Sequence, residues 1–252
     1  MILGEAIKHY NVPRFKLVIS KCFQFVDEDK GPIDPATLTS NDSPRVNRVG
    51  LSRKHILDAV DQSVERLGTY IADPQDGSGK VRYIGASSMA AWGFQILQNV
   101  AHQNGWHKFI SMQGLYSLLR REEERNESLL QLHWRRSVAL APPCRRSSCT
   151  LLDRWNRYSR AEVSLPKLLF RGEDQNTHRA LVDRVEEFAQ RKGVEMAQIA
   201  ESWLIAKGCM PICGLESEER IDQAVGAVQV KLSDEEMKYL EELYVPKVSF
   251  PF

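Results

Sequence analysis

The chain has 252 residues, of which 42% are hydrophobic and 27% are charged, as expected for a globular protein that buries its core in one large domain or two small ones. The 34 Lys and Arg residues balance the 33 Asp and Glu residues, which argues against a nucleic acid or an anionic membrane as the main partner. We therefore expect a small-molecule partner.

The first part of the chain predicts a strand, a loop and a helix. FKLVIS at residues 15–20 is a short apolar run that predicts a buried strand, and Lys21 follows it directly. Residues 22–50 are rich in Asp, Pro, Asn, Thr and Ser, so we expect a long exposed loop. Residues 52–67 predict a helix that begins at the N-cap Ser52, with apolar side chains at helical spacing: Ile56, Leu57, Val60, Val64 and Leu67.

Strand and helix then alternate. KVRYIGAS at residues 80–87 predicts a strand, MAAWGFQILQNVAHQNG predicts a helix that Gly105 ends, and HKFISMQ at residues 107–113 predicts another strand. Short apolar strands that alternate with helices are typical of parallel βαβ units with the helices outside the sheet.

The same order returns near the end of the chain. VEMAQIAESWLIAKG predicts a helix, CMPICGL a strand and SEERIDQAVGAV a helix. SDEEMKYLEELY predicts a final helix, in which Ser233 and Glu236 have the spacing of a capping box.

Residues 126–165 have no clear periodicity and crowd arginines, serines and prolines, so no strand is assigned there. One interpretation is an irregular surface segment with partial disorder. The other is that its basic residues bind an anionic surface.

Neither a membrane span nor a metal site is expected. No stretch approaches the roughly 18 apolar residues that a membrane-spanning helix requires, and residues 1–10 lack the features of a targeting segment, so a cytoplasmic protein is the default expectation. The five cysteines form no CxxC pair and accompany no histidine cluster, which argues against a zinc site or a disulfide framework.

Four segments, GLSRKHILDAVDQSVERLGTYI, SGKVRYIGASSMAAW, HKFISMQGLYSLLRREEER and VEMAQIAESWLIAKGCMPICGLESEERIDQAV, resemble the aldo-keto reductase family in order and spacing. The resemblance covers residues 1–71, 79–125 and 165–247, and fungal aryl-alcohol dehydrogenase-like and secondary-metabolism reductases are the most similar type. It implies an α/β protein of the (β/α)8 TIM-barrel type over residues 1–252, with its site at the carboxyl ends of the strands. The implied reaction is the NADPH-dependent reduction of an aldehyde or ketone, for example an aromatic or polyketide-like carbonyl compound, to an alcohol.

The family uses an Asp, a Tyr, a Lys and a His for catalysis, and the Tyr donates the proton to the developing alkoxide. The resemblance places the Lys at Lys21, where the alternative is an ordinary solvated lysine at a strand end. The Asp and Tyr would fall before Met1. The His belongs to a βα unit for which this chain has only ADPQDGSG after Ile71, so the barrel is expected to lack its N-terminal strands and one internal βα unit.

The resemblance also implies two groups of cofactor-binding residues. Ser87, Ser88 and Gln113 correspond to the residues that bind the nicotinamide carboxamide of NADPH, although they could instead cap the helices that follow them. The segment GLESEER, a loop followed by the start of a helix, corresponds to the residues that bind the 2′-phosphate of NADPH, and Arg220 would supply the positive charge. The alternative is an ordinary helix N-terminus with acidic residues in its first turn. The residues implied at this second position are Gly214, Leu215, Glu216, Ser217, Arg220 and Gln223.

The sequence leaves three interpretations of this chain open. The first is the active reductase, and the second is a catalytically impaired remnant that binds a nucleotide or a partner protein. The third is a mispredicted gene product, because the resemblance stops and returns abruptly around residues 126–165.

Overall fold

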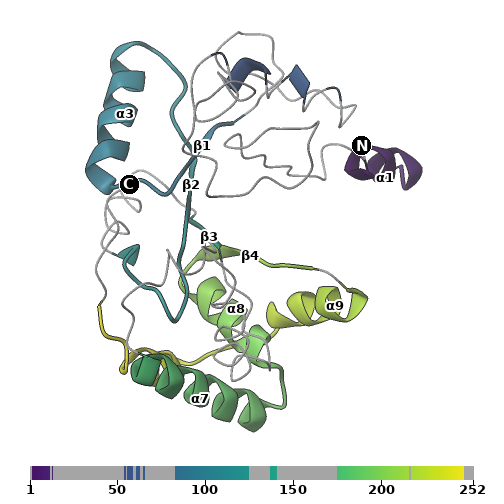
Figure 1. Ribbon diagram of the computed structural model, residues 1–252, viewed down its shortest axis with the longest axis vertical. Coiled ribbons are helices and arrows are strands. Elements are labelled where there is room, and N and C mark those ends of the chain that lie inside the picture. Colours follow the sequence, from purple (N-terminus) through teal and green to yellow (C-terminus); the bar gives the residue numbers. More distant parts are fainter. Residues whose placement is uncertain are drawn as a thin grey trace, which may run out of the picture. The chain divides into compact units, whose positions relative to one another are not determined.

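The computed structural model describes residues 2–11, 13, 54, 56–58, 61, 62, 65, 83–124, 137–140, 175–215 and 217–246 (Figure 1). The chain has two compact units, Met1–Tyr83 and Ile84–Phe252. The predicted strand at residues 15–20, Lys21, the loop over residues 22–50 and the gap after Ile71 all lie outside the described residues.

The first unit contains helical residues at two places. α1 (Ile2–His9) has Glu5 in its first turn and Lys8 and His9 in its last turn, an arrangement that complements the helix dipole. Within the helix predicted over residues 52–67, all the described residues are helical. Lys54 and Asp58 form an ion pair of 2.6 Å there, one turn apart.

The second unit contains a four-stranded, all-parallel sheet in the order β1-β2-β3-β4. Its strands are β1 (Gly85–Ser87), β2 (Ser111–Gly114), β3 (Ser137–Leu140) and β4 (Cys209–Ile212). Every strand pairs with its neighbour in sequence, and parallel neighbours need crossover connections that normally have one hand. The prediction of parallel βαβ units is therefore confirmed for this part of the chain, and an incomplete barrel stays a prediction.

β3 lies within residues 126–165, where the sequence pattern indicated no strand. It pairs with both β2 and β4, so its backbone hydrogen bonds come from neighbours far away in the sequence. A strand of four residues, SVAL, is too short to show a period of its own, which explains why the pattern missed it.

The helices of the second unit follow the predicted pattern with one addition. They are α3 (Ala91–Gln103), α7 (Gln175–Lys192), α8 (Met196–Ala206), α9 (Glu218–Ala227) and α10 (Asp234–Glu241). The predicted capping box of Ser233 and Glu236 is present at the start of α10, and Gly105, with φ 67°, follows α3. α7 had no counterpart among the predicted elements.

The main core of the second unit lies between helices. Trp203 and Leu204 of α8 pack with Val185 and Phe188 of α7 and with Leu240 of α10, and all five are buried. In Figure 1, α8 lies beside β4, which it contacts. A smaller cluster joins β1, β2 and α3 through Ala86, Met112 and Phe94. Among the described residues, no helix is long and apolar enough to span a membrane.

Gln98 of α3 forms two hydrogen bonds with the segment that precedes β2. Its side chain is buried, donates to the carbonyl of Phe109 at 3.1 Å and accepts from the backbone N–H of Phe109 at 3.0 Å. Both backbone groups would lose their partner in Gln98→Leu, so we expect the free energy of unfolding to fall by about 1–3 kcal/mol. Urea unfolding measures this, with the exposed Gln103→Leu as the matched control; an equal loss in both variants would contradict the role of the paired hydrogen bonds.

Candidate functional site

Three predicted nicotinamide-binding residues lie together at the carboxyl ends of β1 and β2. Ser87 pairs directly with Gln113 in the sheet register, and the backbone N–H of Ser88 donates to the carbonyl of Gln113 at 2.9 Å. The hydroxyl oxygens of Ser87 and Ser88 are 3.4 Å apart. Two hydroxyls and one amide at adjacent strand ends can donate to and accept from a carboxamide.

The sheet directs the side chains of Ser87 and Gln113 away from the small core cluster. Side chains alternate along a strand, and Ala86 and Met112, which precede them, are buried against Phe94. Ser87 is exposed and Gln113 is half-buried on the opposite face of the sheet. Ser88 has φ 49°, so the chain turns sharply where β1 ends.

The alternative function of the two serines as helix caps is not seen at α3. The N-cap of α3 is Ala90, and α3 begins without a side-chain capping hydrogen bond. The hydroxyls of Ser87 and Ser88 therefore serve no capping function at the helix that follows them.

The predicted phosphate-binding residues follow β4. Gly214 and Leu215 are exposed, and Ser217 is the N-cap of α9, where its side chain accepts from the backbone N–H of Arg220 at 3.4 Å. Arg220 is half-buried in the first turn of this helix, and Glu216 lies outside the described residues. The first backbone N–H groups of a helix point outward from its start and favour an anion there.

Gln223 is directed along its own helix. Its side-chain amide donates to Glu219 at 3.4 Å, one turn earlier. The amide of Gln223 therefore already has a partner on α9.

The two groups share one edge of one sheet. Gln113 of β2 is in register with position 138 of β3, which is in register with Met210 of β4. Because all four strands are parallel, their carboxyl ends lie at the same edge. Ligands of α/β proteins commonly bind at this edge.

The described part of the structure says little about the predicted catalytic lysine and the histidines. Lys21 lies outside the described residues. His9, His102 and His107 are exposed. Among the described residues, no group of three or more His, Cys, Asp or Glu side chains could hold a metal ion.

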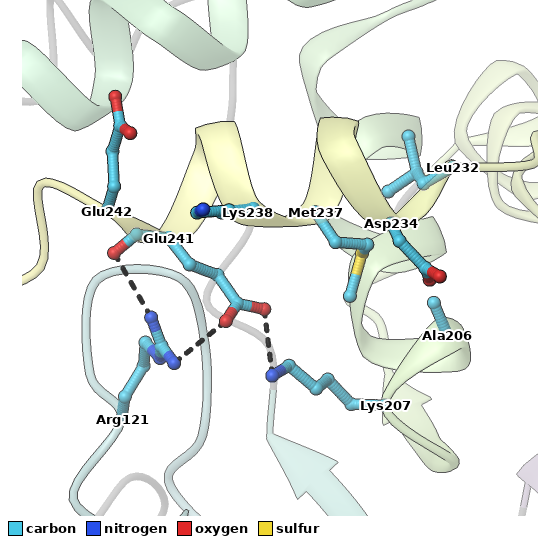
Figure 2. Close-up of a pocket in the computed structure, with 9 residues that line it drawn as sticks. All are labelled: Arg121, Ala206, Lys207, Leu232, Asp234, Met237, Lys238, Glu241 and Glu242. Carbon is cyan, nitrogen blue, oxygen red and sulfur yellow. Dashed lines mark hydrogen bonds and ion pairs between the residues drawn. The ribbon is translucent and has the colours of Figure 1, made fainter.

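Figure 2 shows a pocket with a volume of about 610 Å³, which no pattern in the sequence indicated. Arg121 lies on one side of it, Lys207 on another, and Glu241 of α10 between them. None of its lining residues belongs to the predicted site. They are Arg121, Ala206, Lys207, Leu232, Asp234, Met237, Lys238, Glu241 and Glu242.

Charges of opposite sign pair within this pocket. Glu241 accepts from Arg121 at 3.0 Å, from Lys207 at 2.8 Å and from the indole N–H of Trp203 at 2.8 Å. Glu124 binds the same guanidinium through both carboxylate oxygens, at 3.0 and 2.9 Å. This arrangement binds the segment after β2 to α8 and α10, and its main effect is to stabilise the fold.

The pKa values in this cluster follow from the pairing. Burial raises the pKa of Glu124, but hydrogen bonds from Arg121 and Tyr116 outweigh it, so the net shift is downward. Burial and the hydrogen bond to Glu124 raise the pKa of Tyr116 well above its usual value, which keeps this phenol protonated. Tyr116 therefore acts as a hydrogen-bond donor to Glu124, at 2.7 Å.

Comparison with known proteins identifies related sequences. Residues 70–245 match the model of the Aldo/keto reductase family. Versiconal hemiacetal acetate reductase of Aspergillus parasiticus is 43% identical over 288 residues, which cover 99% of this chain and 80% of the relative. An aldo-keto reductase of Fusarium vanettenii is 35% identical over 278 residues, covering 98% and 74%. A protein of Schizosaccharomyces pombe named as an aryl-alcohol dehydrogenase is 41% identical over 290 residues, covering 97% and 77%.

Proposed function

Because the chain belongs to the aldo/keto reductase family, we propose that it is an NADPH-dependent oxidoreductase that reduces an aldehyde or a ketone to an alcohol. Membership of the family by itself makes it an oxidoreductase of carbonyl compounds, with a nicotinamide cofactor and a (β/α)8 barrel as the family fold. The observation that carries the cofactor assignment is the register pair of Ser87 and Gln113, with Ser88 hydrogen-bonded to the same strand.

The residues at the carboxyl ends of β1 and β2 fit a carboxamide. The amide of Gln113 offers both a donor and an acceptor, and the hydroxyls of Ser87 and Ser88 can do either. A carboxamide held by these groups would have one fixed orientation, so that one face of the nicotinamide ring is turned towards the substrate. The bound cofactor would supply the hydride.

The start of α9 fits the phosphate that distinguishes NADPH from NADH. Ser217 already occupies the N-cap, and Arg220 can add a charge-assisted hydrogen bond to a phosphate. Glu218 and Glu219 in the same turn add negative charge, so the cation of Arg220 is what would favour the phosphorylated cofactor. The family resemblance assigns the catalytic lysine to Lys21, which lies outside the described residues.

The substrate that we propose is an aromatic or polyketide-like carbonyl compound of fungal secondary metabolism. Its support is the names of two relatives, a versiconal hemiacetal acetate reductase and an aryl-alcohol dehydrogenase.

A second candidate is a nucleotide-binding protein without turnover, and one observation favours it. The alignment with the Aspergillus parasiticus relative spans 288 residues, more than the 252 of this chain, so the relative has residues that face gaps here. This supports the inferred loss of an internal βα unit and, with it, of the family's catalytic histidine. A positioned acid or base commonly contributes about 10²- to 10⁴-fold to a rate.

The two candidates differ in turnover. The purified full-length chain is incubated with NADPH and a panel of aromatic aldehydes and ketones, and the alcohol formed is quantified against the NADPH consumed. The reductase predicts equal amounts of both, at a rate that falls in Lys21→Ala. Saturable NADPH binding without any alcohol would favour the second candidate.

A further inference from the structure

The outer face of α3 is apolar and exposed. The helix packs on β1 and β2 through Phe94, and no other described helix contacts it extensively (Figure 1). On the opposite face, Trp92, Ile96 and Val100 follow one another at intervals of one turn and are 71%, 54% and 39% exposed. A helix that packs on a sheet normally has polar and charged residues on its outer face. These three residues form the α3 stripe, which is apolar instead.

The sequence around the α3 stripe contains no Asp, Glu, Lys or Arg. Residues 84–107 have none of the four, although 27% of the whole chain consists of them. α7 shows the usual composition of an outer face, because its exposed positions include Arg179, Asp183 and Glu187. The centres of protein–protein interfaces are depleted of charge and enriched in aromatic residues. The α3 stripe has this composition.

Gly93, three positions before Ile96, lies next to the α3 stripe. A Cβ atom at Gly93 would meet no other part of the described chain within 4 Å, and the φ angle of Gly93 is not positive. Glycine lowers the stability of a helix relative to alanine, and neither packing nor backbone conformation requires it here. The distance between two packed helices depends on the side chains between them, so a glycine lets a second helix come close.

The surface that fits the α3 stripe is itself apolar and uncharged. A partner with charged groups at this place would lose their hydration without forming an ion pair. A helix that lies on a membrane surface usually has Lys or Arg beside its apolar face, and residues 84–107 have neither. A second copy of this chain presents the matching surface, with no like charges to repel each other at the contact.

The exposed apolar side chains of this region can supply the centre of a dimer interface. Leu97, beside the stripe, is 42% exposed, and Trp106, which follows α3, is 64% exposed. Together with the α3 stripe they can bury on the order of 450 Å². A standard interface buries about 800 Å² on each partner, and the outer part of that area is polar.

We propose that the α3 stripe binds the α3 stripe of a second copy of this chain, so that the protein is a symmetric dimer. In a two-fold dimer both copies use the same surface. With the two helices antiparallel, Ile96 in the middle of the stripe faces Ile96 of the second copy, and Trp92 lies against Val100 of the second copy. The proposal does not depend on cofactor binding.

Sedimentation equilibrium of the purified full-length chain over a range of concentrations tests the dimer. We expect a reversible monomer–dimer equilibrium, and Ile96→Lys should weaken it by at least about 100-fold, because two like charges would then face each other. Since the side chain of Ile96 is 54% exposed, circular dichroism should show an unchanged helix content in this variant. A chain that stays monomeric at every concentration would overturn the proposal.

Val225→Lys is the matched control, since it makes the same kind of change at a residue of α9 that is 66% exposed. It should leave dimerisation unchanged. If Val225→Lys weakens dimerisation as much as Ile96→Lys does, the effect comes from added charge in general, and the proposal is wrong.

An opposite charge at the same position tests whether the partner is a second copy. Ile96→Glu alone should weaken dimerisation as Ile96→Lys does. An equimolar mixture of the two variants should dimerise at least about tenfold more tightly than either variant alone, because a lysine and a glutamate then pair across the two-fold axis. A mixture that dimerises no better than its components would overturn the symmetric contact.

Gly93→Gln tests the close approach of the two helices. The new side chain meets no other part of the described chain, and glutamine is a better helix former than glycine, so the helix content should not fall. Dimerisation should weaken by about tenfold, because the side chain occupies the space that the second helix needs. Unchanged dimerisation would contradict this contact. Binding of a monomeric chain to phosphatidylcholine vesicles would assign the stripe to a lipid surface and overturn the proposal.

Discussion

Replacing Glu241 with alanine is expected to lower the free energy of unfolding by about 3 kcal/mol. The substitution removes the carboxylate that Arg121, Lys207 and the Trp203 indole share, and it leaves Glu124 to pair with both cations. The side chains of Arg121 and Glu241 are only 13% and 19% exposed, so water replaces the lost partner poorly. Urea unfolding followed by tryptophan fluorescence measures the loss.

The neighbouring residue supplies the control. Glu242 pairs with Arg184 at 2.6 Å, but its side chain is 48% exposed. Glu242→Ala should therefore cost less than about 1 kcal/mol, as expected for a surface ion pair. Equal losses in the two variants would contradict the shared, half-buried carboxylate as the reason for the effect.

The stability of the folded protein depends on pH through Glu124, which belongs to the same cluster. Because the pKa of Glu124 in the folded protein is held below its ordinary value of 4.5, ionised Glu124 stabilises the folded state above pH 4.5. This stabilisation is lost as the pH falls below 4.5 and the carboxylate takes up its proton. Arg121→Gln should reduce this loss on acidification, because its hydrogen bond is one of the causes of the lowered pKa.

The second large effect is expected at the proposed cofactor site. Arg220→Ala should weaken the binding of NADPH by about 10- to 100-fold, since a hydrogen bond between a guanidinium and a phosphate contributes about 1.5–3 kcal/mol. NADH lacks the 2′-phosphate, so its affinity should hardly change. Fluorescence titration of the two cofactors measures both values.

The control for this prediction is Arg179→Ala, which removes an exposed arginine from α7. It separates a local contact from a general effect of positive charge, because both variants lose one cation. Equal weakening by Arg179→Ala, or equal weakening of NADH binding by Arg220→Ala, would contradict a phosphate contact at Arg220.

The sequence predicted those elements whose signals are local. The stop at Gly105 lies just after α3, and the capping box of Ser233 and Glu236 lies within one turn. Such patterns depend on residues three or four positions apart and need no knowledge of the rest of the fold.

The features that the sequence could not predict depend on partners far along the chain. β3 is a strand because β2 and β4 flank it, and its four residues show no period of their own. Arg121 and Glu241 are 120 positions apart, so the pocket between them has no local signature. Ser87 and Gln113 were assigned to one binding group only through the resemblance to a family. The register of the sheet shows that the two residues are directly paired on β1 and β2.

Whether this chain binds NADPH is tested by a fluorescence titration of the purified chain with the cofactor, after circular dichroism has shown that the sample is folded. We expect saturable binding to a single site, weakened by Arg220→Ala and by Gln113→Ala. A folded sample that shows no saturable binding would contradict it, and membership of the reductase family would then describe only the ancestry of this chain.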